Sequence, residues 1–373
     1  MTSSSIAKSD VQSSSEQGRD RGRSIRRNSI PRIVTIGGGH GQATLLRALR
    51  RFQCQITAIV PVTDDGGCSG ILRRQYDMPP PGDARRCLTS LARDRKLASV
   101  FERRLAMPGT APRSIGNIVI TSEYLASGDM QQAVDRAASM LQCLGRVIPA
   151  GKQAATLLAR DEEGIMILGE TAIAGWNRRP VRVRVMGCEQ ASAEAIEAVG
   201  EADFVLIGPG SFFTSVLACL FTGDLAEAVR GSRARKVFLA NLAEEGQQTR
   251  GYELADYVSL LQDQMQERSG GRLDGLKVLC SSHTPTERLR QDQVEVFQAA
   301  LTEPNRSFHS SRRLAEALEA LLGLSPGQPP RRHGQEAPRS TKTGTDPLLS
   351  RVSEFMQWIG QDSSSGHSSV PAT

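Results

Sequence analysis

A strand, a glycine-rich turn and a helix follow one another in "RIVTIGGGHGQATLLRALRRF", residues 32–52. Similar short apolar runs, rich in β-branched residues and closed by glycine or polar turns, alternate with helical stretches further along the chain. They occupy residues 55–62, 202–210, 235–242 and 275–280. Continuous apolarity is typical of strands covered on both faces. The alternation therefore predicts an α/β fold, a Rossmann-like doubly wound and mostly parallel sheet.

The middle of the chain follows a different pattern. Residues 154–173, "AATLLARDEEGIMILGETAI", contain two strand-like runs around the turn "RDEEG", and residues 179–187, "RPVRVRVMG", alternate apolar and basic positions. This pattern predicts an inserted β-hairpin with one added strand.

Differences in amino-acid composition along the chain predict its division into tails, a domain and a linker. Residues 1–31 are rich in Ser and Arg and poor in apolar residues, which predicts a disordered tail. We expect one nucleotide-binding domain over residues 32–323, a linker over 324–346, an amphipathic helix over 347–361 and a second disordered tail over 362–373. The helix is predicted from apolar residues at helical spacing, namely Leu348, Val352, Phe355, Met356 and Ile359. It would dock on its own domain or on a protein partner, including a second copy of the chain.

The net charge of +6 lies mainly in the tails. Residues 1–32 carry seven Lys or Arg against three acids, residues 331–373 carry five against four, and the body between them is about +1. A nearly neutral body argues against a nucleic-acid partner.

No stretch reaches the length of an apolar membrane span, and the N-terminus lacks the apolar block of a secretory signal. The seven cysteines form no CxxC pair. These features predict a cytoplasmic protein with reduced thiols and without membrane insertion.

Ligands of such sheets bind beyond the carboxyl ends of the strands, so the turns there are the candidate sites. The first turn contains Gly37, Gly38, Gly39, His40 and Gly41, and it opens a helix whose free N–H groups would bind a phosphate. No Gly-Lys-Ser/Thr follows, which excludes a Walker A loop, and the dinucleotide fingerprint is imperfect.

The second turn, "TDDGGCSG", brings two adjacent carboxylates, Asp64 and Asp65, before Gly66 and Gly67. Either carboxylate could contact a ribose hydroxyl or a metal-bound phosphate. In "PPPGDARRCL", Asp83 could cap a helix, whereas the helix dipole gives no reason for Arg85 in its first turn. We therefore expect Arg85 to contact an anionic ligand.

Three further segments offer polar groups at helix starts or strand ends. They contribute Ser114, Gly116 and Asn117; Gly208, Gly210, Ser211 and Thr214; and Asn241. Each segment alone is more often a capping motif, but glycine or polar turns at four strand ends together indicate one shared site.

In order and spacing, these motifs resemble the 2-phospho-L-lactate-transferase-like (CofD-like) family over roughly residues 32–323, and within it the gluconeogenesis-factor (YvcK-type) branch. The chain departs from the family pattern at a few polar positions, among them Ala43, Cys68 and Arg86. The resemblance implies a Rossmann-like fold with a nucleotide site. Transferases of the family move a phospholactyl group from a guanosine diphosphate donor with Mg²⁺, whereas the gluconeogenesis-factor branch is linked to UDP-sugars, the cell wall and cell shape.

Three functions follow as hypotheses. The first is a regulatory protein that binds a nucleotide sugar, with UDP-N-acetylglucosamine as the expected ligand. The second is a Mg²⁺-dependent transferase in which Asp65 or Asp83 holds the metal or acts as the base. The third is an NAD(P)-linked oxidoreductase, disfavoured by the imperfect fingerprint, so NAD is not expected. Asp64 and Asp65 are the candidate metal ligands.

Overall fold

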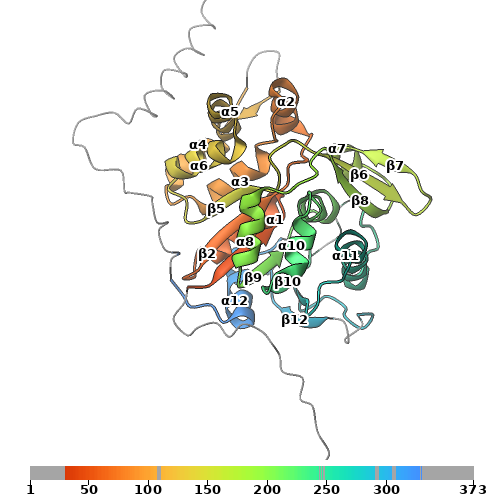
Figure 1. The fold of residues 1–373 in the computed structure, drawn as a ribbon. Coiled ribbons are helices and arrows are strands. Elements are labelled where there is room, and N and C mark those ends of the chain that lie inside the picture. The colour runs from red at the N-terminus through yellow and green to blue at the C-terminus, as the bar shows by residue number, and fades with distance from the viewer. Residues whose placement is uncertain are drawn as a thin grey trace, which may run out of the picture. The chain divides into compact units, whose positions relative to one another are not determined.

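Seven parallel strands form the main sheet of the protein, in the order β12-β11-β10-β9-β1-β2-β5 (Figure 1). The structure is a computed structural model that describes residues 30–106, 111–242, 244, 246, 248–289, 294–304, 308–327 and 329. All of them belong to one compact unit, Met1–Arg331. The strands are β1 (Arg32–Ile36), β2 (Gln55–Val60), β5 (Arg146–Pro149), β9 (Phe204–Ile207), β10 (Arg235–Leu239), β11 (Lys277–Ser281) and β12 (Glu295–Ala299).

The strand order reverses at the centre of this sheet. From β1 the chain proceeds outward to β2 and β5, returns to β9 on the other side of β1, and continues to β10, β11 and β12. The loops after β1 and β9 therefore leave in opposite directions. Doubly wound sheets bind ligands in a crevice at such a reversal, beyond the carboxyl ends of the strands, so we expect the crevice here.

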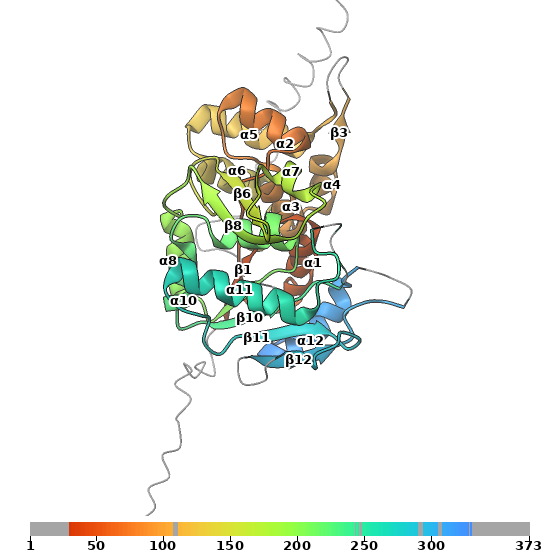
Figure 2. The same ribbon diagram turned by 90° about the vertical axis from the view of Figure 1, so that its right-hand side faces the viewer.

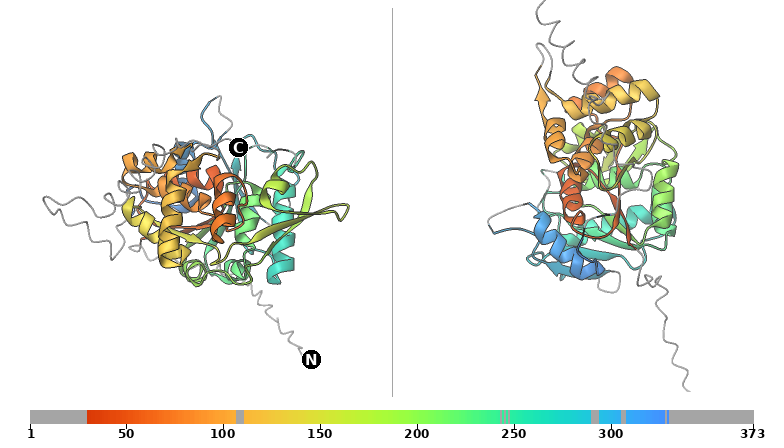
Figure 3. Two further views of the ribbon diagram at one scale, coloured as in Figure 1. Left: turned by 90° about the horizontal axis from the view of Figure 1, so that it is seen from above. Right: turned by 90° about the vertical axis from the view of Figure 1, so that its left-hand side faces the viewer.

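Helices cover both faces of the main sheet (Figures 2 and 3). On β9, Phe204 and Leu206 join one hydrophobic core while Val205 and Ile207 join the other, so successive side chains serve opposite layers. One layer contains α1 (Gly39–Leu49), α3 (Gly82–Leu91), α6 (Met130–Met140) and α12 (Ser311–Leu322), and the other contains α8 (Ala193–Glu201), α10 (Leu225–Gly231) and α11 (Leu254–Ser269).

The remaining described helices are α2 (Gly67–Tyr76), α4 (Arg95–Glu102), α5 (Ile115–Ser127), α7 (Glu170–Ala174), α9 (Ala218–Leu220) and the π-helix η1 (Phe212–Leu217). In the described part of the chain, no single helix is long and apolar enough to cross a membrane, although the bent pair Phe212–Leu220 and Leu225–Gly231 passes on length and composition together. Most of that pair is buried in the core.

The predicted insertion is a separate antiparallel sheet in the order β7-β6-β8. β6 (Thr156–Asp161) and β7 (Met166–Leu168) flank the predicted turn, and β8 (Pro180–Met186) is the added strand. The predicted fold class is thus confirmed. The sequence did not predict β5, β12 or the two-residue ribbon of β3 (Arg104–Leu105) and β4 (Arg113–Ser114), because these strands are too short or too exposed for a clear apolar run.

The described chain continues beyond residue 323, where the sequence placed the start of the linker. The N–H of Gln53 donates to Ser325 (3.0 Å), and that of Gly327 donates to Arg51 (2.8 Å). The tail predicted over residues 1–31 lies almost wholly outside the described residues, and the helix over 347–361 and the tail over 362–373 lie entirely outside them.

Candidate functional site

The turns after β1 and β9 pack directly against each other at the strand-order reversal. A Cβ added to Gly41 would lie 2.5 Å from the carbonyl oxygen of Pro209, and one added to Gly210 would lie 3.0 Å from that of Gly38. Asn241, after β10, holds this junction because its Nδ2 donates to the Gly210 carbonyl (2.7 Å) and its Oδ1 accepts the Gly210 N–H (3.2 Å). The sequence-predicted turns therefore do meet, and Asn241 acts by positioning a loop.

The start of α1 combines free N–H groups with nearby cations. The Gly39 N–H donates to Asp83 Oδ1 (2.9 Å), and Arg86 donates to the same oxygen (3.0 Å). The N–H groups of His40 and Gly41 have no partner among the described residues, as expected in the first turn of a helix. These two groups are available to an anion.

The charged groups around the start of α1 shift the pKa of His40. Burial lowers that pKa, and the guanidinium groups of Arg86, Arg47 and Arg85 lower it further, against an opposing effect of Glu102. Three cations thus act on a helix N-terminus that already favours negative charge, and two of them are paired, Arg86 with Asp83 and Arg85 with Glu102. In the sequence, Arg86 stands out only as a departure from the family pattern.

Asp64, in the turn after β2, lies in an environment that disfavours its charge. Its Oδ1 accepts the Gly66 N–H (2.9 Å). Burial raises the pKa of Asp64, and the neighbouring carboxylate of Asp83 raises it further. A bound cation would relieve both effects.

Asp65 is hydrogen-bonded to the inserted segment. Its Oδ1 accepts the backbone N–H (2.9 Å) and the hydroxyl (2.6 Å) of Thr171, at the start of α7. A Cβ on Gly169 would lie 2.5 Å from Asp65 Oδ2, so glycine is required at that approach. The two adjacent carboxylates predicted as a metal pair therefore have different partners.

Glu170 is a further candidate site residue, which no sequence pattern predicted. It accepts a hydrogen bond from the Thr63 hydroxyl (3.2 Å). Burial raises the pKa of Glu170 well above its ordinary value, followed by the effects of Asp64 and Asp83. No motif marked Glu170, because it lies in the insertion more than a hundred residues from the turn that it contacts; only its place just after a predicted strand could have drawn attention.

Arg85 has internal partners. It is 4% exposed, donates from Nε to Asn117 Oδ1 (3.0 Å) and pairs with Glu102. Gly116 leaves room for the Arg85 side chain, since a Cβ there would lie 2.8 Å from Arg85 Cγ. Arg85, Gly116 and Asn117 thus pack against one another, and the predicted ligand contact of Arg85 stays a prediction.

The remaining predicted residues have the following local contacts. Thr214 donates to Ser211 Oγ (2.7 Å) at the start of η1. The Ser114 hydroxyl is buried without a partner in the described structure. Gly66 lies against Thr171, while Gly37, Gly39, Gly67 and Gly208 have the positive φ angles that glycine adopts readily.

The described side chains do not form a complete metal site. No group of three or more His, Cys, Asp or Glu residues within the described ranges is placed to hold a metal ion. Any Mg²⁺ would therefore need oxygen ligands from a bound phosphate in addition to Asp64, which is a common arrangement for this ion.

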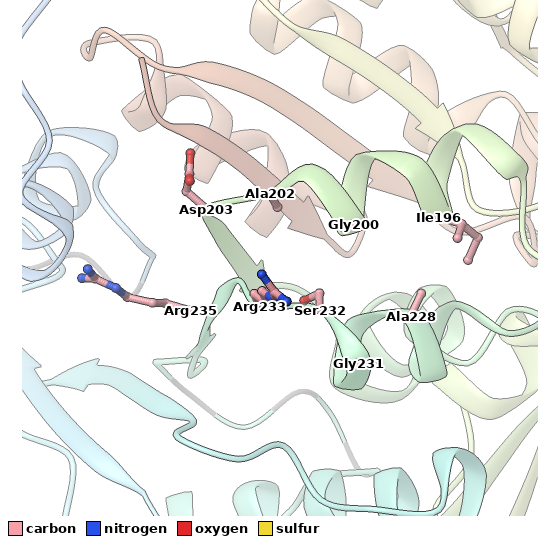
Figure 4. A pocket seen from close by; sticks show the side chains of 9 residues that line it. All are labelled: Ile196, Gly200, Ala202, Asp203, Ala228, Gly231, Ser232, Arg233 and Arg235. Atoms are coloured by element: carbon pink, nitrogen blue, oxygen red, sulfur yellow. The ribbon is translucent and has the colours of Figure 1, made fainter. Parts of the chain in front are cut away.

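A cavity of about 550 Å³ lies at the amino ends of β9 and β10 (Figure 4). Its lining comes from the last turns of α8 and α10 and the residues that follow, including Gly200, Asp203, Gly231 and Arg233. None of the predicted site residues lines it. The cavity and the candidate site thus occupy opposite ends of the same strands.

Known proteins are similar to this chain in sequence and in fold. The family model described as 2-phospho-L-lactate transferase CofD matches residues 33–312. A gluconeogenesis factor of Listeria monocytogenes is 32% identical over 321 residues, covering 80% of this chain and 98% of that protein. A Nostoc sp. protein is 38% identical over 244 residues, 64% of this chain, and the match spans 53% of the length of that protein.

A crystal structure of a Bacillus halodurans protein superposes with a TM-score of 0.72 at 29% identity, covering 78% of this chain and 99% of that one. The family model, the relatives and the fold therefore agree. The chain belongs to the CofD family and has gluconeogenesis factors among its relatives.

Proposed function

We propose that this protein binds a nucleotide diphosphate sugar at the start of α1, beside the junction of the turns after β1 and β9, and that it regulates cell-envelope metabolism during gluconeogenic growth. UDP-N-acetylglucosamine is the ligand we put forward. The observation that carries the proposal is the start of α1, where the unpartnered N–H groups of His40 and Gly41 lie in the field of three arginines.

The diphosphate is the part of the ligand that this geometry fits. Its oxygens would accept from the His40 and Gly41 N–H groups, while Arg86 balances the negative charge. The Ser211 hydroxyl lies at the start of η1, directly after the turn that packs against the start of α1. It offers a further polar group to the ligand. The junction of glycine turns keeps these groups in place before the ligand arrives, which reduces the entropic cost of binding.

Mg²⁺ fits the acidic side of the crevice if the ligand completes its coordination. Asp64 would hold the ion, because burial and Asp83 already disfavour its unbalanced negative charge. Asp65 fits less well, since one of its oxygens accepts two hydrogen bonds from Thr171. When bound, Mg²⁺ would neutralise part of the diphosphate charge.

The carboxylates of Asp65 and Asp83 are each held through one oxygen. Oδ1 of Asp65 accepts from Thr171 and Oδ1 of Asp83 accepts from Gly39 and Arg86, whereas Oδ2 of either accepts from no described residue. A general base needs such a free carboxylate oxygen within reach of the acceptor hydroxyl. The second candidate function, a transferase, is favoured by one observation: Glu170 is a buried carboxyl with a raised pKa, as general bases often are.

Calorimetric titration of the purified protein tests the proposal. UDP-N-acetylglucosamine would be added with and without Mg²⁺, with GDP and NADH as comparison ligands. We expect selective binding of the UDP-sugar without turnover, together with weakened binding in an Arg86→Gln variant. Binding of GDP without detectable binding of the UDP-sugar would contradict the proposal and favour the transferase function.

A further inference from the structure

The strand β7 is the free edge of the inserted sheet (Figure 1). Its side chains Met166 and Leu168 are 58% and 57% exposed, and the preceding Ile165 is 44% exposed. The run from Gly164 to Gly169 has no proline and no charged residue. Apart from its shortness, this edge lacks the features by which proteins prevent strands from pairing between molecules.

The backbone of β7 is also free to pair. Antiparallel pairing directs alternate residues toward the neighbouring strand. Ile165 accepts the Asp161 N–H and Gly169 donates to Leu157, both of β6, so residues of odd number bond to β6. The N–H and C=O groups of Met166 and Leu168 consequently point outward, and they bond to no described residue.

We propose that β7 pairs in antiparallel fashion with β7 of a second copy of this chain, about a twofold axis at Ile167. Met166 then lies opposite the partner's Leu168, and Leu168 opposite the partner's Met166. Each of these two pairs exchanges two backbone hydrogen bonds, which joins the two inserted sheets into one sheet of six strands.

The charges on the outward face fit this register. In the β6–β7–β8 sheet, Met166 lies opposite Arg160 and Arg160 opposite Arg182, whereas Leu168 lies opposite Leu158 and Leu158 opposite Arg184. Across the axis, each row of side chains therefore has an apolar centre and arginines at its two ends. Adjacent strands are about 4.8 Å apart, so the arginines of the two copies stay roughly 19 Å or more from each other within a row.

The pairing would also restrain the candidate site. Glu170 and Thr171 follow β7 after a single residue and bond to Thr63 and Asp65. Holding β7 in a six-stranded sheet fixes the start of α7 against the turn after β2. This consequence rests on the proposed function, whereas the pairing itself does not.

Light scattering over a range of concentrations tests the pairing. We expect the full chain to reach twice its mass of 40.3 kDa at high concentration, and Met166→Lys to remain monomeric. Leu168→Pro should have the same effect, because it removes only an outward N–H that the monomer does not use. Leu125→Lys, at an apolar residue 56% exposed on α5, is the matched control and should still dimerise.

Two outcomes would overturn the proposal: a wild-type chain that stays monomeric at about 100 μM, or dimers that persist in both Met166→Lys and Leu168→Pro. UDP-sugar binding by the Met166→Lys monomer is measured alongside. Normal binding with loss of the dimer would separate this proposal from the proposed function.

Cysteine cross-linking tests the register. Directly opposed residues of a strand pair are close enough for a disulfide, and the seven native cysteines are all buried. A mixture of the Met166→Cys and Leu168→Cys chains should cross-link on oxidation, whereas either variant alone should cross-link far less. Equal cross-linking of the single variants would refute the register.

Discussion

The turns that follow the neighbouring strands β1 and β2 are held in different ways. The turn after β1 packs against that after β9, backbone on backbone, and leaves the N–H groups of His40 and Gly41 free. The turn after β2 is held by side chains, since Thr63 and Asp65 bond to the start of α7 in the insertion. One half of the crevice is thus built by the main sheet, and the other half depends on an added element.

The same two turns differ in charge. Arginines lie near the start of α1. Burial is the largest cause of the lowered pKa of His40, and these arginines lower it further. Carboxylates surround the turn after β2. Burial and then Asp83 raise the pKa of Asp64, and burial, Asp64 and Asp83 raise that of Glu170. We infer that the first half receives an anion directly and that the second accepts one only together with a cation.

Closing the space at the backbone junction should have the largest effect. In Gly41→Ala, the new Cβ would lie 2.5 Å from the Pro209 carbonyl oxygen and 2.7 Å from the Gly210 nitrogen, both backbone atoms. We expect a loss of about 1–3 kcal/mol of unfolding free energy and no measurable UDP-sugar binding, by chemical denaturation and calorimetry.

Gly200→Ala is the matched control for that substitution. Gly200 lies in α8, beside the cavity at the opposite end of the strands, and a Cβ there would meet nothing within 4 Å. Alanine should leave binding intact and stabilise the helix by up to about 1 kcal/mol. If Gly41→Ala behaved like this control, the junction would not be the rigid half of the site.

Removing the central cation should weaken binding next in order. Hydrogen bonds to charged groups contribute about 1.5–3 kcal/mol, so Arg86→Gln should reduce UDP-sugar affinity by roughly tenfold or more. Because Asp83 also loses its partner, the Tm of the variant is recorded in parallel. Arg136→Gln removes an exposed ion pair with Glu123 and should leave the affinity unchanged.

The acidic half can be tested by Glu170→Gln. The pKa of Glu170 is raised above its ordinary value of 4.5, so folding favours the protonated form, and its stabilising contribution is lost as the pH rises through the raised pKa. Glutamine resembles the protonated form. The Tm should therefore rise by about 2 °C at neutral pH, and this gain should disappear as the pH falls to the ordinary range of a glutamate.

Scanning calorimetry from acid to neutral pH measures this gain, with the exposed Glu162→Gln as a control that should show none. Saturating Mg²⁺ and UDP-sugar should shrink the difference, because a bound cation removes the repulsion. A Tm that fell at neutral pH would show that the Glu170 carboxylate is charged and needed in the fold.

The smallest effect should appear at His40. An anion next to the imidazole favours its charged form, so binding should raise the lowered pKa of His40 toward its ordinary value. A ¹H–¹³C NMR titration of the histidine ring, with and without the ligand, measures the shift. An unchanged pKa at saturation would place the diphosphate away from the start of α1.

Local sequence determined the main sheet and its turns. The apolar runs from Ile33 and Ile56 had to be covered strands, and the glycines after them had to be turns, because apolarity and backbone freedom are properties of the residues themselves. The order of the motifs was enough to identify the family. Short or exposed strands such as β5 and β12 carried too little of this signal.

The partners of the charged residues were decided only by the tertiary structure. The sequence predicts Asp65 as a metal ligand and Arg85 as a ligand contact. Only the structure shows that Thr171, 106 residues away, bonds to the Asp65 carboxylate and that Glu102 pairs with Arg85. The sequence determined the fold and the family, and it predicts the edge of the sheet at which a ligand would bind. It did not determine which charges remain free for that ligand, because a charge is free or paired according to contacts that exist only when distant segments pack together.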